Sequence, residues 1–124
     1  MPESTRRFRF GAAQRLTGQG AFDRVLAGRR SRTIDGLMIA AVPSAVGRHR
    51  LGVNVPKRIG HSVARHHLRR RLREAFRLTR KDLPGAYDIV IVVRALPLPG
   101  ADLGAMLAEA LAKLDLIWRA ESRV

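Results

Sequence analysis

Arginine is the residue type in this sequence that most clearly indicates a chemical role, because it is abundant and unevenly placed. The 124 residues include 24 Lys and Arg against 10 Asp and Glu, which gives a formal net charge of +14. Residues 1–81 hold 20 of the basic side chains and only 4 of the acidic ones. A small domain usually carries a net charge of about 2–8 in magnitude, and a guanidinium group can hold a phosphate with two hydrogen bonds. The sequence therefore predicts a polyanionic partner.

The densest basic stretch, residues 57–81, includes a predicted helix from about residue 63 to about residue 81, with Ser62 as its N-cap. The apolar residues of this helix fall in one sector of its surface, which predicts a buried stripe: Ala64, Leu68, Leu72, Ala75 and Phe76. Beside that stripe runs a row of guanidinium groups that we call the arginine ridge: Arg65, Arg69, Arg73 and Arg80. His66, Arg70 and Arg77 lie further round the helix. The spacing favours contact with successive phosphates. The alternative is a solvated charged face, on which Glu74 pairs with Arg70, Arg71 or Arg77.

Catalytic and metal-binding groups are scarce by comparison. His61, His66 and His67 do not converge on one point, there is no cysteine, and no histidine stands beside a recognisable nucleophile or orienting carboxylate. We therefore expect a binding protein with no catalytic residue and no metal site of its own. The absence of cysteine and of a long apolar run favours a cytoplasmic protein without membrane contact, and we expect a monomer.

The elements that must position these side chains follow the order helix, strand, strand, helix, strand, helix. Residues 1–16 form a basic, loosely ordered arm, and residues 17–124 form a single domain. We predict a helix near residues 21–28, strands at 34–42, 49–56 and 87–93, and a last helix at 102–120. This order predicts an α/β (α+β) sandwich with a small mixed sheet. The first two strands would pair as an antiparallel hairpin. The second and third strands could flank the long helix in a βαβ crossover, which is ordinarily right-handed.

Three further residues have more than one interpretation. Phe22 either anchors its helix or offers a platform for stacking bases. Gly52 and Asn54 alternate with the apolar residues of their strand, so they point away from its apolar face. They either line a groove for extended RNA or face solvent.

A family resemblance rests on residues 50–77, RLGVNVPKRIGHSVARHHLRRRLREAFR. This segment closely resembles the signature of the bacterial ribonuclease P protein subunit, in which a strand and a basic connector lead into a helix that begins Arg-Asn-Arg. AFDRVLAGRR is similar to the first helix of that family and the basic turn after it, and LPGAYDIVIVVRALP is similar to its later strand. This sequence departs from the family pattern where it reads Arg65-His66-His67. Leu26 and Ala40 also stand where relatives often carry aromatic residues.

The resemblance implies a fold, partners and site residues. The fold would be an α/β sandwich whose βαβ crossover is left-handed. The partners would be a catalytic RNA subunit and precursor tRNA, whose 5′ leader is removed with Mg²⁺ bound largely by RNA. The residues that would contact the RNA subunit are Arg65, His66, His67, Arg69, Arg70, Arg73 and Arg77. A cleft between the motif helix and the sheet would take the leader, lined or bordered by Phe22, Asn54, Lys57, Arg58 and Arg94.

Two other functions explain part of the sequence. A ribosomal or RNA-chaperone protein would explain the charge equally well, but it would not explain residues 50–77. A free-standing nuclease would need more acidic side chains in the basic part of the chain than the sequence provides.

Overall fold

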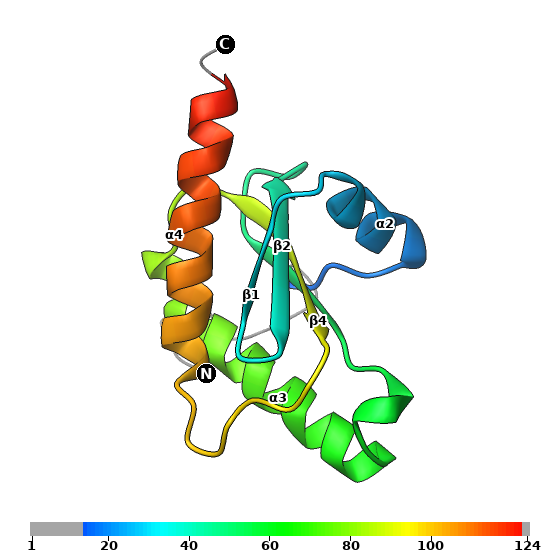
Figure 1. Ribbon diagram of the computed structural model, residues 1–124. Coiled ribbons are helices and arrows are strands. Elements are labelled where there is room, and N and C mark those ends of the chain that lie inside the picture. The colour runs from blue at the N-terminus through cyan, green and yellow to red at the C-terminus, as the bar shows by residue number, and fades with distance from the viewer. Residues whose placement is uncertain (1–13, 123–124) are drawn as a thin grey trace, which may run out of the picture.

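Four strands form one mixed sheet in the computed structural model, which describes residues 14–122. The elements are α2 (Gln19–Ala27), β1 (Ser31–Ile34), β2 (Leu37–Pro43), β3 (Arg50–Asn54), α3 (Ser62–Thr79), β4 (Tyr87–Val93) and α4 (Leu103–Ser122), with 3₁₀ turns η2 (Lys57–Ile59) and η3 (Arg80–Asp82). The strand order is β1-β2-β4-β3, in which β4 runs antiparallel to β2 and parallel to β3. The predicted α+β sandwich with a mixed sheet is confirmed. Figure 1 shows α4 and α2 on opposite sides of the strands.

The predicted hairpin between the first two expected strands is wrong, because β4 lies between β2 and β3. β2 pairs instead with β1, a short and largely exposed strand that the sequence reading missed. The two are joined at Asp35 and Gly36, whose φ angles of 43° and 78° lie in the left-handed region. Asp-Gly is a favoured pair for such tight hairpin turns. β4 takes an inner place because its side chains from Ile89 onward are apolar on both faces and nearly all buried.

The predicted βαβ unit is present, since β3 and β4 are parallel neighbours joined through α3. Its left-handedness stays an implication of the family resemblance. α3 begins one residue earlier than predicted, and its N-cap is His61 and not Ser62. The reason is that His61 Nδ1 accepts a hydrogen bond from the Ala64 N–H at 3.4 Å. The helix ends at Thr79, and η3 occupies the last predicted residues.

The main core lies between one face of the sheet and the pair α3 and α4. The buried stripe of α3 and the apolar face of α4 pack against side chains of β2, β3 and β4. The central members of this core are Leu68, Leu72, Phe76, Leu107, Leu111, Leu114, Leu37, Ile39, Leu51, Ile89 and Ile91. None of the helices within residues 14–122 is long and apolar enough to cross a membrane.

A smaller core lies on the opposite face, beneath α2. Val25 packs there with Leu16, Ala40, Val42 and Val90. Leu16 was assigned to the predicted basic arm, but its side chain is buried and its N–H donates to the Leu51 carbonyl at 3.0 Å. Leu16 is therefore part of the folded domain. Residues 1–13 of the predicted arm lie outside the described residues.

Candidate nucleic-acid interface

The arginine ridge of α3 borders the buried stripe, as the spacing predicted. Its four guanidinium-bearing residues are half-buried, while Leu68, Leu72 and Phe76 are buried beneath them. Arg65 also holds the chain that leads into the helix, because its Nε donates to the Gly60 carbonyl at 3.1 Å. His66, His67 and Arg70 are exposed further round the helix.

Mutual repulsion is the main electrostatic feature of the ridge. Burial lowers the pKa of Arg73, and the positive charges of Arg15 and Arg69 lower it further. Burial likewise lowers the pKa of Arg80, with a further contribution from Arg77. Arg73 and Arg80 nevertheless stay protonated at neutral pH, so a bound polyanion would relieve the repulsion. Sequence reasoning did not place Arg15 here. Its bridge to Leu51 at the edge of β3 brings it near Arg73.

Arg77 differs from the other predicted contacts because it already has an acidic partner. Its Nε and Nη2 donate to the two carboxylate oxygens of Glu74 at 2.9 and 2.5 Å. The hydrogen bond from Arg77 is the main reason that the pKa of Glu74 is lowered. Of the three partners predicted for Glu74, the structure selects Arg77.

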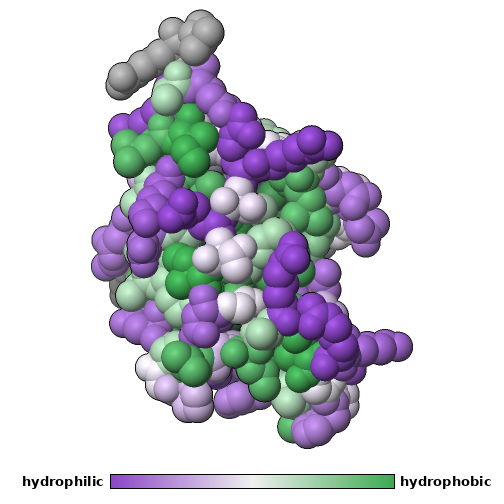
Figure 2. All heavy atoms as spheres, in the orientation of Figure 1, coloured by the Kyte–Doolittle hydropathy of each residue, from purple (hydrophilic) through white to green (hydrophobic). Residues whose placement is uncertain are grey.

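The largest departure from expectation concerns the cleft. Where the cleft between α3 and the sheet was predicted, the described residues show a packed core, in which Leu68, Leu72 and Phe76 fill the interface. A hollow of about 360 Å³ lies instead on the opposite face, where α2 leaves the sheet uncovered. We call it the α2 cleft, and its lining residues are Leu26, Arg29, Arg30, Ser31, Met38, Ala40, Asn54, Val92 and Arg94. Its apolar side chains come from α2, β2 and β4, and its three cations are arginines. In Figure 2 hydrophilic side chains gather near the end of β4 and the start of α3, beside apolar surface.

The predicted leader contacts lie at one end of the α2 cleft. Asn54 and Arg94 line it, and Asn54 also lines an adjoining hollow of about 330 Å³ together with Phe22. Arg58 reaches from η2 to the main chain just after β4, where its Nη1 donates to the Arg94 carbonyl at 2.8 Å. Lys57 is exposed in the same turn. The structure thus brings four of the five residues to one edge of the sheet and places Lys57 beside them.

Phe22 and Gly52 form one contact that decides between their alternative interpretations. Gly52 neither faces solvent nor lines a groove, because it is buried beneath the ring of Phe22. A Cβ at position 52 would lie 2.5 Å from a carbon of that ring. Phe22 therefore anchors α2 to β3, and its half-buried ring still borders the hollow beside Asn54.

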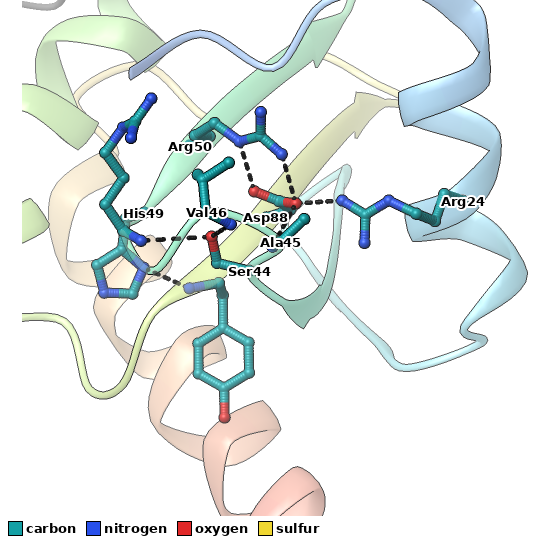
Figure 3. A network of polar contacts seen from close by, with 9 residues as sticks. Arg24, Ser44, Ala45, Val46, His49, Arg50 and Asp88 are labelled. Carbon is teal, nitrogen blue, oxygen red and sulfur yellow. Dashed lines mark hydrogen bonds and ion pairs between the residues drawn. The ribbon is translucent and has the colours of Figure 1, made fainter. Parts of the chain in front are cut away.

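A buried ion-pair network, which sequence reasoning missed, ties α2 to the sheet (Figure 3). Asp88 of β4 is fully buried, and both its carboxylate oxygens accept from Arg50 of β3 at 2.8 Å. Arg24 of α2 donates to one of the same oxygens. Burial would raise the pKa of Asp88, but the hydrogen bonds from Arg50 and Arg24 outweigh it and hold the pKa below its ordinary value. The only signal in the sequence was an acid placed at the start of an apolar strand.

A helix rich in arginine and an apolar cleft with a cationic rim, both on one α+β sandwich, are features of a nucleic-acid-binding protein. The Ribonuclease P family model matches residues 10–115. The ribonuclease P protein component of Syntrophobacter fumaroxidans is 40% identical over 97 residues, which cover 76% of each chain. That of Herpetosiphon aurantiacus is 34% identical over 83 residues, which cover 67% of this chain and 68% of the relative.

A solved structure from the same family has a similar fold. The RNase P protein from Thermotoga maritima superimposes with a TM-score of 0.61 at 26% identity, over 64% of this chain and 75% of that one. The chain belongs to the ribonuclease P protein family. Its role is that of a protein subunit of ribonuclease P, in the processing of tRNA 5′ ends.

Proposed function

We propose that this subunit binds two RNA elements at adjoining surfaces. The arginine ridge, with His66, His67 and Arg70, lies against the catalytic RNA subunit, and the α2 cleft takes the single-stranded 5′ leader of precursor tRNA. The observation that carries the proposal is the contact of Arg58 with the Arg94 carbonyl. It joins the turn that leads into α3 to the end of the α2 cleft, so the two polyanions would meet at one edge of the sheet.

The ridge suits a folded RNA because its charges are fixed in a row along one helix. α3 is held by a buried apolar stripe, so its arginines are presented on a rigid element. Glu74, the one acidic residue of α3, is engaged by Arg77. Phosphates arranged along an RNA strand would bind these guanidinium groups and release the counterions that both surfaces hold.

The α2 cleft suits an extended single strand. Its apolar surface, from Leu26, Met38 and Val92, can cover the faces of unstacked bases. Arg29 and Arg94 lie where phosphates of the same strand would pass, and the Asn54 amide offers hydrogen bonds to base edges. Ala40 and Leu26 provide packing in place of aromatic stacking, so we expect little discrimination between bases there.

The cleavage chemistry belongs to the RNA in this proposal. Residues 14–122 contain no group of three or more His, Cys, Asp or Glu side chains that could hold a metal ion. Asp88 and Asp115, the two buried acids, are both paired with arginine. In the holoenzyme, Mg²⁺ would be bound largely by RNA, while the protein screens the repulsion between the RNA subunit and the leader. We expect the holoenzyme to act in the cytoplasm.

The test is a Mg²⁺ titration of precursor tRNA cleavage by a bacterial ribonuclease P RNA, with and without this protein. We expect the protein to lower the Mg²⁺ concentration needed for half-maximal cleavage, because its arginines replace part of the screening that Mg²⁺ otherwise provides. A polylysine of matched charge serves as the control for unspecific screening. Equal Mg²⁺ requirements with and without the protein would contradict the proposal, as would an equal effect of polylysine.

A further inference from the structure

Asp88 stands out among the described residues as a fully buried charge on the face of the sheet that α2 covers. Within residues 14–122 the only other buried charged residue is Asp115, which lies on α4. Burying a carboxylate is costly unless it is paired and hydrogen-bonded. Asp88 has partners from two elements, Arg50 of β3 and Arg24 of α2, and it also accepts a long hydrogen bond from the Ala45 N–H at 3.4 Å.

The helix that receives this ion pair has few other attachments. α2 has nine residues, no side-chain hydrogen bond at its N-cap Gly18, and one fully buried residue, Val25. Helices of this length are marginal in water on their own. Its attachment to the sheet includes the packing of Val25 and Ala21 in the small core, the ring of Phe22 on Gly52, and the ion pair of Arg24.

The order of residues around α2 gives these contacts different roles. At about 100° per residue, Arg24 and Leu26 lie on opposite flanks of the helix, with Val25 between them facing the sheet. Arg24 pins one flank to Asp88, while Leu26 forms part of the wall of the α2 cleft on the other. A helix held only along its centre line could roll about its axis, and such a roll would move Leu26 and Phe22 relative to Asn54.

We propose that the Arg24–Asp88 ion pair is a positioning device. It holds α2 at the rotation in which Leu26 borders the α2 cleft and Phe22 borders the adjoining hollow. The pair acts through α2, so Arg24 and Asp88 are positioning residues that do not touch RNA. The proposal rests on the proposed function of the α2 cleft. Arg50 completes the device, because its two hydrogen bonds fix the carboxylate, and Arg24 shares one of the two oxygens with it.

Substitution of Arg24 weakens the attachment of α2 without leaving a buried charge unpaired. Arg50 continues to neutralise Asp88, so Arg24→Ala avoids the large penalty of an unpaired carboxylate. The side chain of Arg24 is 42% exposed, which keeps its own contribution modest. Because Arg24 contacts Asp88 through one nitrogen, a lysine can take its place, whereas the two-pronged contact of Arg50 could not be made by lysine.

The experiment uses holoenzyme assembled from a bacterial ribonuclease P RNA and the full-length protein. Two precursor tRNAs are compared, one with a long single-stranded leader and one with a leader of a single nucleotide. For Arg24→Ala we expect the ratio of the two affinities to fall about fivefold, and we expect Arg24→Lys to restore it. Lys113→Ala is the matched control, because it also removes a cation that pairs with an acid, Glu109 at 3.4 Å, but on α4 and without leaving a buried carboxylate unpaired. It should leave the ratio unchanged.

Hydrogen exchange supplies a readout that is independent of the leader. In Arg24→Ala the amides of α2 should exchange faster while those of α3 stay protected. An unchanged affinity ratio in Arg24→Ala would overturn the proposal. So would an equal loss for both precursors accompanied by faster exchange in α3, since that result would mean a general loss of structure. If the unsubstituted holoenzyme shows no preference for the long leader, the leader-binding function itself fails, which is distinguishable from a failure confined to Arg24→Ala.

Discussion

The arginine ridge allows a quantitative test in which two guanidinium groups are removed and the salt dependence of RNA binding is measured. Arg69 and Arg70 are the suitable pair. Arg65 would be a poorer choice because it also bonds the Gly60 carbonyl, and Arg77 is engaged by Glu74. Arg69 is half-buried and Arg70 is exposed, and alanine is the best helix former. The double variant Arg69→Ala/Arg70→Ala should therefore keep α3 folded.

The expected magnitude follows from counterion release. Each phosphate contact contributes about 0.7–0.9 to the slope of log affinity against log salt concentration. Loss of two contacts should reduce that slope by about 1.4–1.8. The affinity for the RNA subunit near physiological salt should fall about 5- to 30-fold, which corresponds to about 1–2 kcal/mol for one exposed and one half-buried charged contact.

The assay is filter binding of the protein to the RNA subunit over a series of KCl concentrations, with circular dichroism to check folding. A control of equal charge is Arg32→Ala/Lys113→Ala, which removes exposed cations from β1 and α4. β1 is the edge strand furthest from β3, so this control lowers the net charge equally while leaving α3 intact. An unchanged slope in the ridge variant, or the same change in the control, would refute the assignment of this face to RNA.

Two further predictions concern the attachment of α2. The folded pKa of Asp88 lies below its unfolded value of about 3.9, so its ion pairs stabilise the fold above that pH and this contribution is lost as pH falls through the folded pKa. Asp88→Asn should lower the free energy of unfolding at pH 7 by about 2–3 kcal/mol. It should also flatten the decline of that free energy below about pH 4, as measured by urea unfolding. A decline as steep as that of the unsubstituted protein would contradict this. Gly52→Ala places a Cβ 2.5 Å from the Phe22 ring and should cost about 1–3 kcal/mol of unfolding free energy. Gly20→Ala, with nothing within 4 Å, should instead stabilise α2 by about 0.5–1 kcal/mol, and similar effects of the two substitutions would be inconsistent with the Phe22–Gly52 contact.

Local sequence pattern was enough to predict most of the elements. The periodicity of α3, the apolar run of β4 and the amphipathic face of α4 each identify one element with bounds close to those observed. The pairing of the strands was not predictable in the same way. Arg50–Asn54 alternates as a strand should, yet nothing in that alternation says whether its partner is β2 or β4. β1 was missed because it is short, polar and exposed, so it carries little hydrophobic pattern.

The arginine ridge and the α2 cleft also differ in how far the sequence predicted them. The ridge on α3 is a property of one helix, so residue spacing alone predicted which arginines share a face. The α2 cleft is assembled from α2, all four strands and the turn between α2 and β1, and the sequence, from which we expected a cleft between α3 and the sheet, did not predict it. Asp88 shows the same limit, because its partners Arg24 and Arg50 lie 64 and 38 residues away in the chain.

The amino-acid sequence by itself determined that this protein is a small folded domain with a large positive charge, and that one helix carries that charge in a row beside a buried stripe. These are consequences of composition and of the period of a helix, both of which are local. Only the tertiary structure decided where the second surface lies. It did so by inserting β4 between β2 and β3 and by burying Asp88 against arginines from two other elements. A cleft and a buried ion pair depend on which distant segments share a face, and that is settled by packing.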